Sequence, residues 1–380
     1  MVSKKKPKIL FILTLPPPLH GANIANEALW NSEVRQAFDS ILLDISDHRD
    51  VNNLGKLDPV NVTLALKSMV ALCSRLLKER LDLAYLLISQ NNLAFFRDGL
   101  YILLIKAISK KTRVLIHLHG SNFKRFYKNT HWFMKRFIDF TLKRVDAAIV
   151  LGDSLKPILT DWIKEVHVVP NGTDIRFSLD KKRKGHNENE IVLFLSNLAK
   201  SKGVADVVKS AVYVTREYPQ VIYKMAGMWK DDSSFNVRGD ALQKEVTEII
   251  QSNGIENSVQ FLGVVSGKAK EELLLNADIF VLPSYCEGQP KSIIEAMAAG
   301  CPVISTRTGA IPETVMDNKT GFLIDPGNPE MLTDRIIRLI EDKNLCHRMG
   351  MAARIRYQAL YTQEHFIANM MGVFKDVLAH

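Results

Sequence analysis

Cysteine is scarce in this sequence. Four cysteines occur among 380 residues, at positions 73, 286, 301 and 346, and their spacing forms no metal-binding pair. Small secreted domains depend on paired cysteines, so the sequence argues against a disulfide framework as well as a zinc site. We therefore expect a protein of the reducing cytoplasm.

Long hydrophobic runs are also lacking. No stretch approaches the roughly 18 continuous apolar residues of a membrane span, so we expect any membrane contact to be peripheral. The run Ile9–Leu15 is short and meets three prolines, which favours a buried first strand of a doubly wound sheet over a secretory signal. No Gly-x-Gly-x-x-Gly follows this run, which disfavours a nicotinamide-dependent oxidoreductase.

Positive charge is concentrated in the first half of the chain. Residues 1–178 contain 26 Lys and Arg against 16 Asp and Glu, whereas the remainder contains 24 against 25. No stacking motif or nucleic-acid-binding module accompanies this excess, so nucleic acid is not an expected partner. An anionic membrane surface or a phosphate-bearing acceptor is the predicted partner of the basic half.

The segment Asn122–Arg144 is rich in both basic and aromatic residues. Its rings could lie at the headgroup level of a bilayer, with its cations on anionic lipid. It could equally be a surface helix whose aromatics are core and whose charges are solvated. The charge asymmetry of the chain favours the membrane interpretation.

A strand, a loop and a helix are predicted around residues 277–300. The apolar run Ala277–Pro283 indicates a buried parallel strand, Pro290 suits the first turn of a helix, and Gly300 ends that helix. Backbone N–H groups of about residues 289–291 then lie at the positive end of the helix dipole. They suit a diphosphate and need no metal.

Two glutamates frame this predicted anion site. Glu287 lies in the loop, and Glu295 lies five residues into the helix, roughly 7 to 8 Å along its axis. A nucleoside-diphosphate sugar offers hydroxyls on both sides of its phosphates, one set from the sugar and one from the ribose. From the residues alone, an ordinary strand–turn–helix with two solvated glutamates explains the pattern equally well.

The segment from Glu287 to Val303 resembles the paired-glutamate signature of retaining glycosyltransferases of family 4. The resemblance rests on both glutamates, the intervening Gly-x-Pro and the Glu-Ala-Met-Ala-Ala-Gly sequence that begins at Glu295. It implies the GT-B fold, an α/β architecture of two Rossmann-like, doubly wound parallel-sheet domains that face a cleft. It also implies retaining transfer of a hexosyl-type unit without a metal or other cofactor.

Positions outside this segment match the same family. His119 falls where the family carries a histidine beside the transferred sugar, whereas His117 is interpreted as a packed histidine. Lys202 matches the lysine of the family's Gly-Arg-Leu-x-x-x-Lys-Gly loop, which neutralises the donor diphosphate. Asn197 replaces the arginine of that loop, so neutralisation depends on Lys202 and the helix amides, with Lys200 as a further candidate.

Three further positions complete the predicted site. Gly21 opens the turn into a helix predicted from about Asn23 to Ala37, and Ala22 replaces the family's second glycine there. Gly227 ends a strand, and Leu262 lies where the family lines the nucleotide base. The predicted donor-binding residues are Gly21, Asn197, Lys202, Gly227, Leu262, Glu287, Gly288, Gln289, Pro290, Lys291 and Glu295. The predicted catalytic residues are His119, Glu287 and Lys202, and no metal ligand or cofactor is predicted.

The resemblance also implies a division into domains. Residues 1–178, joined by a C-terminal helix at about 360–380, form the predicted acceptor-binding domain, and residues 190–358 form the nucleotide-sugar-binding domain. The polar segment 180–190 is the predicted linker, and the chain is expected to cross back near residues 355–362.

The predicted function is transfer of a sugar from a nucleoside-diphosphate sugar to a hydroxyl of a saccharide or lipid-linked acceptor. Surface polysaccharide or lipopolysaccharide biosynthesis, at the inner face of the cytoplasmic membrane, is the expected setting. The alternative is a nucleotide-sugar-binding regulatory or scaffold protein that has lost turnover.

Overall fold

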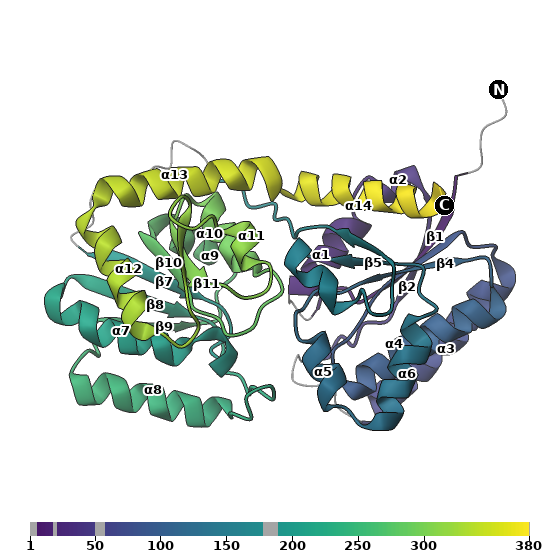
Figure 1. Ribbon diagram of the computed structural model, residues 1–380, viewed down its shortest axis with the longest axis horizontal. Helices are drawn as coiled ribbons and strands as arrows, with labels where there is room; N and C mark the ends of the chain where they lie inside the picture. The colour runs from purple at the N-terminus through teal and green to yellow at the C-terminus, as the bar shows by residue number, and fades with distance from the viewer. Residues whose placement is uncertain (1–5, 18–20, 50–57, 178–188, 380) are drawn as a thin grey trace. The chain divides into compact units, whose positions relative to one another are not determined.

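The computed structural model describes residues 6–17, 21–49, 58–177 and 189–379 (Figure 1). They form two compact units, of which the first comprises the chain up to Gly172 together with the C-terminal segment from Gln363. The second unit comprises Thr173–Thr362. Each unit is built on a six-stranded parallel sheet, as the α/β prediction required. Most of the predicted linker, residues 180–188, and residues 18–20 of the predicted first turn lie outside the described residues.

The first sheet has the strand order β2-β1-β3-β4-β5-β6. Its strands are β1 (Lys8–Leu13), β2 (Asp39–Asp44), β3 (Leu83–Leu87), β4 (Arg113–His117), β5 (Ala147–Val150) and β6 (Glu165–Val168). The central strands are buried on both faces, which explains why β1 reads as an unbroken apolar run in the sequence.

Three helices cover one face of this sheet: α1 (Gly21–Trp30), α2 (Val34–Ala37) and α14 (Gln363–Ala379). Phe374 of α14 packs edge-on against Phe11 of β1 and Tyr85 of β3, with ring centroids 5.6 and 5.4 Å away. The C-terminal helix therefore contributes to the hydrophobic core of the first unit.

The sequence suggested one helix from about Asn23 to Ala37, but the chain forms two. The break lies at residues 31–33, where the Ser32 hydroxyl donates to Leu29 O (2.6 Å) and accepts from Val34 N (3.2 Å). A serine side chain that bonds to nearby backbone groups competes with the helical hydrogen bonds, which accounts for the interruption.

The other face carries α3 (Pro59–Lys78), α4 (Asn92–Ile108), α5 (Phe123–Asn129) and α6 (Trp132–Leu142), which lie together in Figure 1. Among the described residues, α3 is the one helix whose length and composition would allow it to cross a membrane, and 17% of its most apolar window is buried. Asn61 and Lys67 interrupt its apolar residues, in agreement with the lack of a continuous hydrophobic run.

The second sheet has the strand order β12-β11-β10-β7-β8-β9. Its strands are β7 (Glu190–Leu195), β8 (Val221–Ala226), β9 (Val259–Gly263), β10 (Ile279–Leu282), β11 (Val303–Thr306) and β12 (Gly321–Ile324). The helices of this unit are α7 (Val204–Glu217), α8 (Gly239–Asn253), α9 (Gly267–Asn276), α10 (Lys291–Ala298), α11 (Ile311–Thr314), α12 (Pro329–Glu341) and α13 (Lys343–Leu360).

The boundary between the units differs from the predicted one. Residues 173–177 belong to the second unit, because Thr173 N donates to Tyr361 O (3.1 Å) and the Tyr357 hydroxyl donates to Ile175 O (2.9 Å). Helix α13 continues to Leu360, so the expected crossing segment at 355–362 is mostly helical. Sequence patterns miss such a boundary because it depends on contacts between distant segments.

Candidate functional site

The candidate site lies where the strand order of the second sheet reverses. Strand β7 has its successor β8 on one side and β10 on the other. In doubly wound sheets, ligands bind at the carboxyl edge beside such a reversal, because the two connecting segments leave the sheet toward opposite faces. Lys202 follows β7 and Glu287 follows β10, so both lie at this edge.

Backbone contacts join the two loops that carry these residues. Tyr285 N donates to Ser201 O over 2.8 Å. Gly203 has φ +74°, and a Cβ at this position would lie 2.3 Å from Pro283 O. Both the conformation and the close approach require glycine, so the sequence Lys202-Gly203 fixes one loop against the other.

Lys202 and Glu287 form an ion pair at this junction. Lys202 Nζ donates to Glu287 Oε1 over 2.5 Å, and Ser284 Oγ donates to the same oxygen over 3.1 Å. The side chains are 21% and 12% exposed, so a ligand could still reach both. The structure thus brings together two residues that the sequence analysis had assigned to one site.

Helix α10 begins beside this pair. Pro290 is its N-cap, no side chain of the described residues caps it, and Gly300 at φ +74° follows its end. The first N–H groups of a helix have no partner within the helix, and they lie at the positive end of its dipole. The N–H groups at this helix start belong to Lys291 and the residues after it, because Pro290 has no N–H, so the expected range 289–291 begins about two residues too early. Gly288 and Gln289 lie in the loop immediately before Pro290.

Glu295 lies on the buried side of α10 and is 9% exposed. Lys270 of α9 donates to Glu295 Oε1 over 2.9 Å. Burial lowers the pKa of Lys291 to about 8, an effect that Glu295 and Asp174 oppose. A second cation–carboxylate pair therefore lies along the helix from the first.

The ends of β7, β8 and β9 supply the other predicted residues of the second unit. Gly227 follows β8, and a Cβ there would lie 1.8 Å from Ser196 O, so only glycine fits. Asn197 is exposed after β7, and Leu262 in β9 is 40% exposed. Parallel strands present their carboxyl ends at one edge, which places these residues on the same edge as Glu287.

His119 and Gly21 belong to the first unit. The rings of His117 and His119 lie 4.0 Å apart, and the Tyr85 hydroxyl is 2.8 Å from His117 Nδ1. Burial, with a smaller effect of His119, lowers the pKa of His117 well below its ordinary value. His117 is thus a packed neutral histidine, as the sequence analysis interpreted it, and it supports the ring of His119.

Gly21 begins α1, and a Cβ there would meet no atom of the described residues within 4 Å. The fold itself therefore gives no steric reason for glycine at this position. Among the described residues, no cluster of three or more His, Cys, Asp or Glu side chains could hold a metal ion.

Comparison with known sequences identifies a family that matches the unit carrying this site. Residues 176–356, nearly the whole second unit, match the family described as glycosyl transferases group 1. The second unit of the chain therefore belongs to this family. The match confirms that the segment beginning at Glu287 resembles a glycosyltransferase.

Curated relatives of this glycosyltransferase act on different substrates. N-acetyl-alpha-D-glucosaminyl L-malate synthase of Bacillus anthracis is 28% identical over 282 residues, which cover 71% of this chain and 70% of that protein. The MMP alpha-(1->4)-mannosyltransferase of Mycolicibacterium hassiacum is 27% identical over 243 residues, which cover 60% of this chain and 54% of that protein.

Solved structures show that the glycosyltransferase has the GT-B fold. Sucrose-phosphate synthase from Thermosynechococcus elongatus superposes with a TM-score of 0.77 at 18% identity, over 98% of this chain and all of that one. Anabaena HepE, solved in complex with UDP-glucose, superposes with a TM-score of 0.73 at 18% identity, over 97% of this chain and 99% of that one.

Lys270 contacts a residue of the candidate site, and the sequence analysis did not name it. It lies in α9, 25 positions before Glu295, and no motif marks it. The sequence offered no signal for this contact, because Lys270 and Glu295 lie on different helices, α9 and α10. Lys270 thus adds a third lysine to this edge of the sheet beside Lys202 and Lys291, and it is paired with Glu295 as Lys202 is with Glu287.

Proposed function

We propose that this glycosyltransferase transfers a hexosyl-type unit from a nucleoside-diphosphate sugar to an acceptor hydroxyl, with retention of anomeric configuration and without a metal. The observation that carries the proposal is the Lys202–Glu287 pair beside the start of α10. A diphosphate at this helix start would contact Lys202, while Glu287 would accept hydrogen bonds from hydroxyls of the sugar.

The remaining donor contacts follow from the same pose. Glu295 accepts hydrogen bonds from the ribose, and Lys291 adds positive charge beside the phosphates. Gly227 and the exposed segment around Leu262 accommodate the rest of the nucleotide. A metal cation is not needed to neutralise the diphosphate, because two lysines and the positive end of a helix dipole face it.

The chemical step needs stabilisation of the leaving group more than a strong nucleophile. The bond between the anomeric carbon and the β-phosphate oxygen breaks, a bond to the acceptor oxygen forms, and the acceptor hydroxyl gives its proton to the leaving diphosphate. Lys202 and the amides of α10 stabilise the charge that grows on the diphosphate. His119, from the acceptor-binding first unit, contacts the transferred sugar and orients it.

We place the acceptor among saccharides or lipid-linked saccharides, in surface polysaccharide or lipopolysaccharide assembly at the inner face of the cytoplasmic membrane. The basic first half of the chain supports this proposal. So does its 24% identity, over 200 residues, to the capsular polysaccharide biosynthesis glycosyltransferase CapM of Staphylococcus aureus.

The test is incubation of the purified chain with a panel of nucleoside-diphosphate sugars and a membrane lipid extract, with and without EDTA. We expect nucleoside diphosphate to be released from one donor, equally with EDTA, and the product linkage to keep the donor configuration in its NMR spectrum. Donor binding without release under every acceptor condition would instead identify a regulatory or scaffold protein. An inverted linkage or a loss of activity with EDTA would contradict the proposed mechanism.

A further inference from the structure

Exposed apolar side chains are concentrated on one layer of helices in the first unit. Among the described residues, 20 large hydrophobic side chains are exposed, and 11 of them lie on α3, α4 and α6. These helices contain only 20, 17 and 11 residues. Helix α4 packs against both α3 and α6, so the three form one continuous layer (Figure 1).

Helix α3 has a continuous apolar stripe that faces away from its packing partners. Its buried residues are Ser68, Leu72 and Leu76, which share one side. Leu66, Val70 and Leu77 are 58%, 71% and 77% exposed. At about 100° per residue, these three and Val62 fall within roughly 80° of the helix circumference, on a different side from the buried residues.

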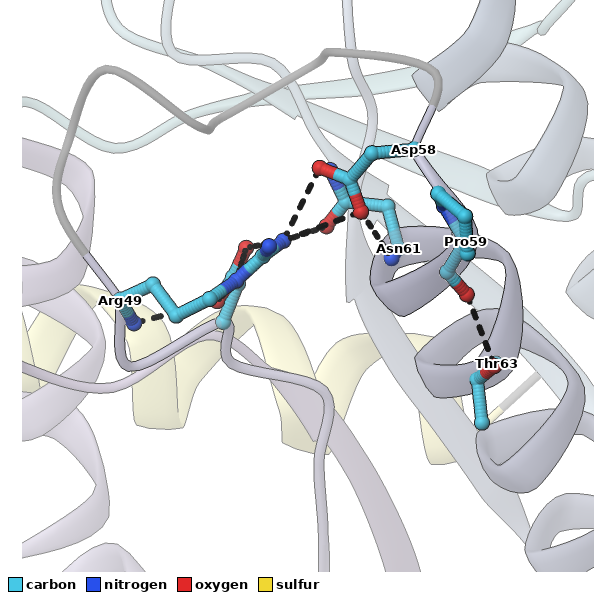
Figure 2. A network of polar contacts seen from close by, with 6 residues as sticks. Arg49, Asp58, Pro59, Asn61 and Thr63 are labelled. Atoms are coloured by element: carbon cyan, nitrogen blue, oxygen red, sulfur yellow. Dashed lines mark hydrogen bonds and ion pairs between the residues drawn. The ribbon is translucent and has the colours of Figure 1, made fainter.

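The start of α3 is fixed by a polar network, shown in Figure 2. The side chain of Asp58 caps the helix by accepting from Asn61 N over 2.8 Å. Arg49 donates to Asp47 Oδ2 over 2.7 Å, to Asp58 Oδ2 over 3.2 Å and to Asn61 Oδ1 over 3.1 Å. The exposed stripe is thus presented by an anchored helix.

Helix α6 adds aromatic side chains and a cation to the layer. Trp132, Phe133 and Phe140 are 56%, 65% and 51% exposed, and the rings of Trp132 and Phe133 stack with centroids 3.7 Å apart. Arg136 is exposed one turn after Trp132, and the Arg144 guanidinium lies 3.4 Å from the centroid of the Phe140 ring. Tryptophan beside arginine is typical of side chains at a membrane–water interface.

The same region holds most of the excess positive charge. Residues 59–144 contain 16 Lys and Arg against 4 Asp and Glu, a surplus of 12 in a chain whose net charge is +9. Helices α3 and α5 contain no acidic residue. Of the acidic residues in the other two helices, Asp98 is buried against Arg97, and Asp139 accepts from the Trp162 indole over 2.7 Å.

We propose that the exposed face of α3, α4 and α6 docks on an anionic lipid bilayer, with the apolar stripe of α3 and the rings of α6 in the interface and the lysines and arginines on lipid headgroups. An apolar surface on helices that contain many more Lys and Arg than Asp and Glu fits this occupant, because a protein partner would have to match both features over three helices. The inference deepens the proposed function by naming the surface that brings the enzyme to a lipid-linked acceptor.

The test is sedimentation of the full chain with vesicles of phosphatidylcholine alone or phosphatidylcholine mixed with phosphatidylglycerol. The test variants are Leu66→Gln with Val70→Gln on α3, and Lys135→Gln with Arg136→Gln on α6. The matched control is Ile355→Gln, which is 61% exposed on α13 of the second unit. All these side chains are at least partly exposed, so we expect the melting temperatures of the variants to stay near that of the wild type. A lowered melting temperature would reveal a misfolded variant.

We expect binding only to vesicles that contain phosphatidylglycerol, weakened by salt. The α3 pair should lower the partition coefficient about tenfold or more, and the α6 pair about fivefold per charge removed, which corresponds to about 1 kcal/mol per cation. The control should bind as the wild type does. The proposal would be overturned if the wild type bound both vesicle types equally, or if the control variant lost as much vesicle binding as the α3 variant. It would also be overturned if the wild type were a dimer that the α3 substitutions dissociate.

The outcome can be separated from that of the proposed function. Nucleoside diphosphate binding, measured by calorimetry without lipid, should be unchanged in the α3 and α6 variants. Lys202→Met should bind vesicles as the wild type does but fail to transfer sugar. Normal transfer to lipid-linked acceptors by an α3 variant that no longer sediments would contradict the docking surface and leave the donor chemistry standing.

Discussion

Lys202 Nζ donates to Glu287 Oε1 over 2.5 Å, although the two residues are 85 positions apart in the chain. The contact exists because their loops follow β7 and β10, which are neighbours in the sheet. The lysine orients the carboxylate, and the carboxylate holds the lysine at the start of α10. One pair thus prepares both the phosphate contact and the sugar contact of the proposed reaction.

Replacement of Lys202 by Met should lower kcat about 100-fold or more. The lost ammonium would no longer stabilise the leaving diphosphate, and removal of a single group that stabilises transition-state charge commonly costs this much. Steady-state kinetics with the donor found in the panel assay would measure the effect. The matched control is Lys209→Met, because Lys209 is an exposed lysine on α7. A wild-type kcat for Lys202→Met would contradict the role assigned to Lys202.

Glu295→Gln should weaken binding of the donor nucleotide about tenfold and change kcat less, because a ribose contact acts equally in the ground state and the transition state. The wild type should also bind nucleoside diphosphate more tightly than its 2′- and 3′-deoxy analogues, and the variant should lose this discrimination. Titration calorimetry with the three nucleotides would measure both effects. Discrimination that survives in Glu295→Gln would place the ribose elsewhere.

Lys270→Met should show a milder version of the same change. Lys270 donates to Glu295 Oε1 over 2.9 Å and keeps the carboxylate oriented along α10. Its loss should weaken nucleotide binding severalfold and leave the melting temperature close to that of the wild type. A variant that binds nucleotide as tightly as the wild type would show that Glu295 needs no such support.

The pKa of Lys291, lowered to about 8 by burial, predicts two pH dependences. Nucleoside diphosphate affinity should fall as pH rises through about 8, because the folded chain loses this ammonium. Stability should rise with pH between about 8 and the ordinary value of 10.5, because over this range the unfolded chain binds more protons than the folded one. Calorimetry and thermal melts from pH 6 to 10 would measure both dependences. Lys291→Met should abolish both of them, whereas the control Lys209→Met should keep both.

Tyr85→Phe should destabilise the first unit by roughly 1 to 3 kcal/mol, because it removes the partner of a fully buried ring nitrogen. The Tyr85 hydroxyl lies 2.8 Å from His117 Nδ1, and both side chains are at most 1% exposed. Thermal melts would measure the change, with the half-exposed Tyr213→Phe as the control. An equal melting temperature for both variants would show that the contact contributes nothing to the fold.

The positions of the strands and of α10 could be predicted because they depend on local patterns. The run Ala277–Pro283 gave β10, and Pro290 and Gly300 marked the ends of α10 within two residues. The spacing of Glu287 and Glu295 fixed their places in the loop and the helix. The break between α1 and α2 was missed, because it depends on how the Ser32 side chain bonds to the backbone.

The sequence by itself determined the α/β class and the strand–loop–helix unit that carries both glutamates, because these are set by periodicity and turn residues, and it indicated the family through the resemblance of the segment that begins at Glu287. Only the tertiary structure decided that Lys202 meets Glu287, that Lys270 meets Glu295, and that the stripe of Leu66 and Val70 faces outward. The physical reason is that helical periodicity marks apolar stripes without telling which one is covered, and that pairs of distant residues meet only through the order of strands in a sheet.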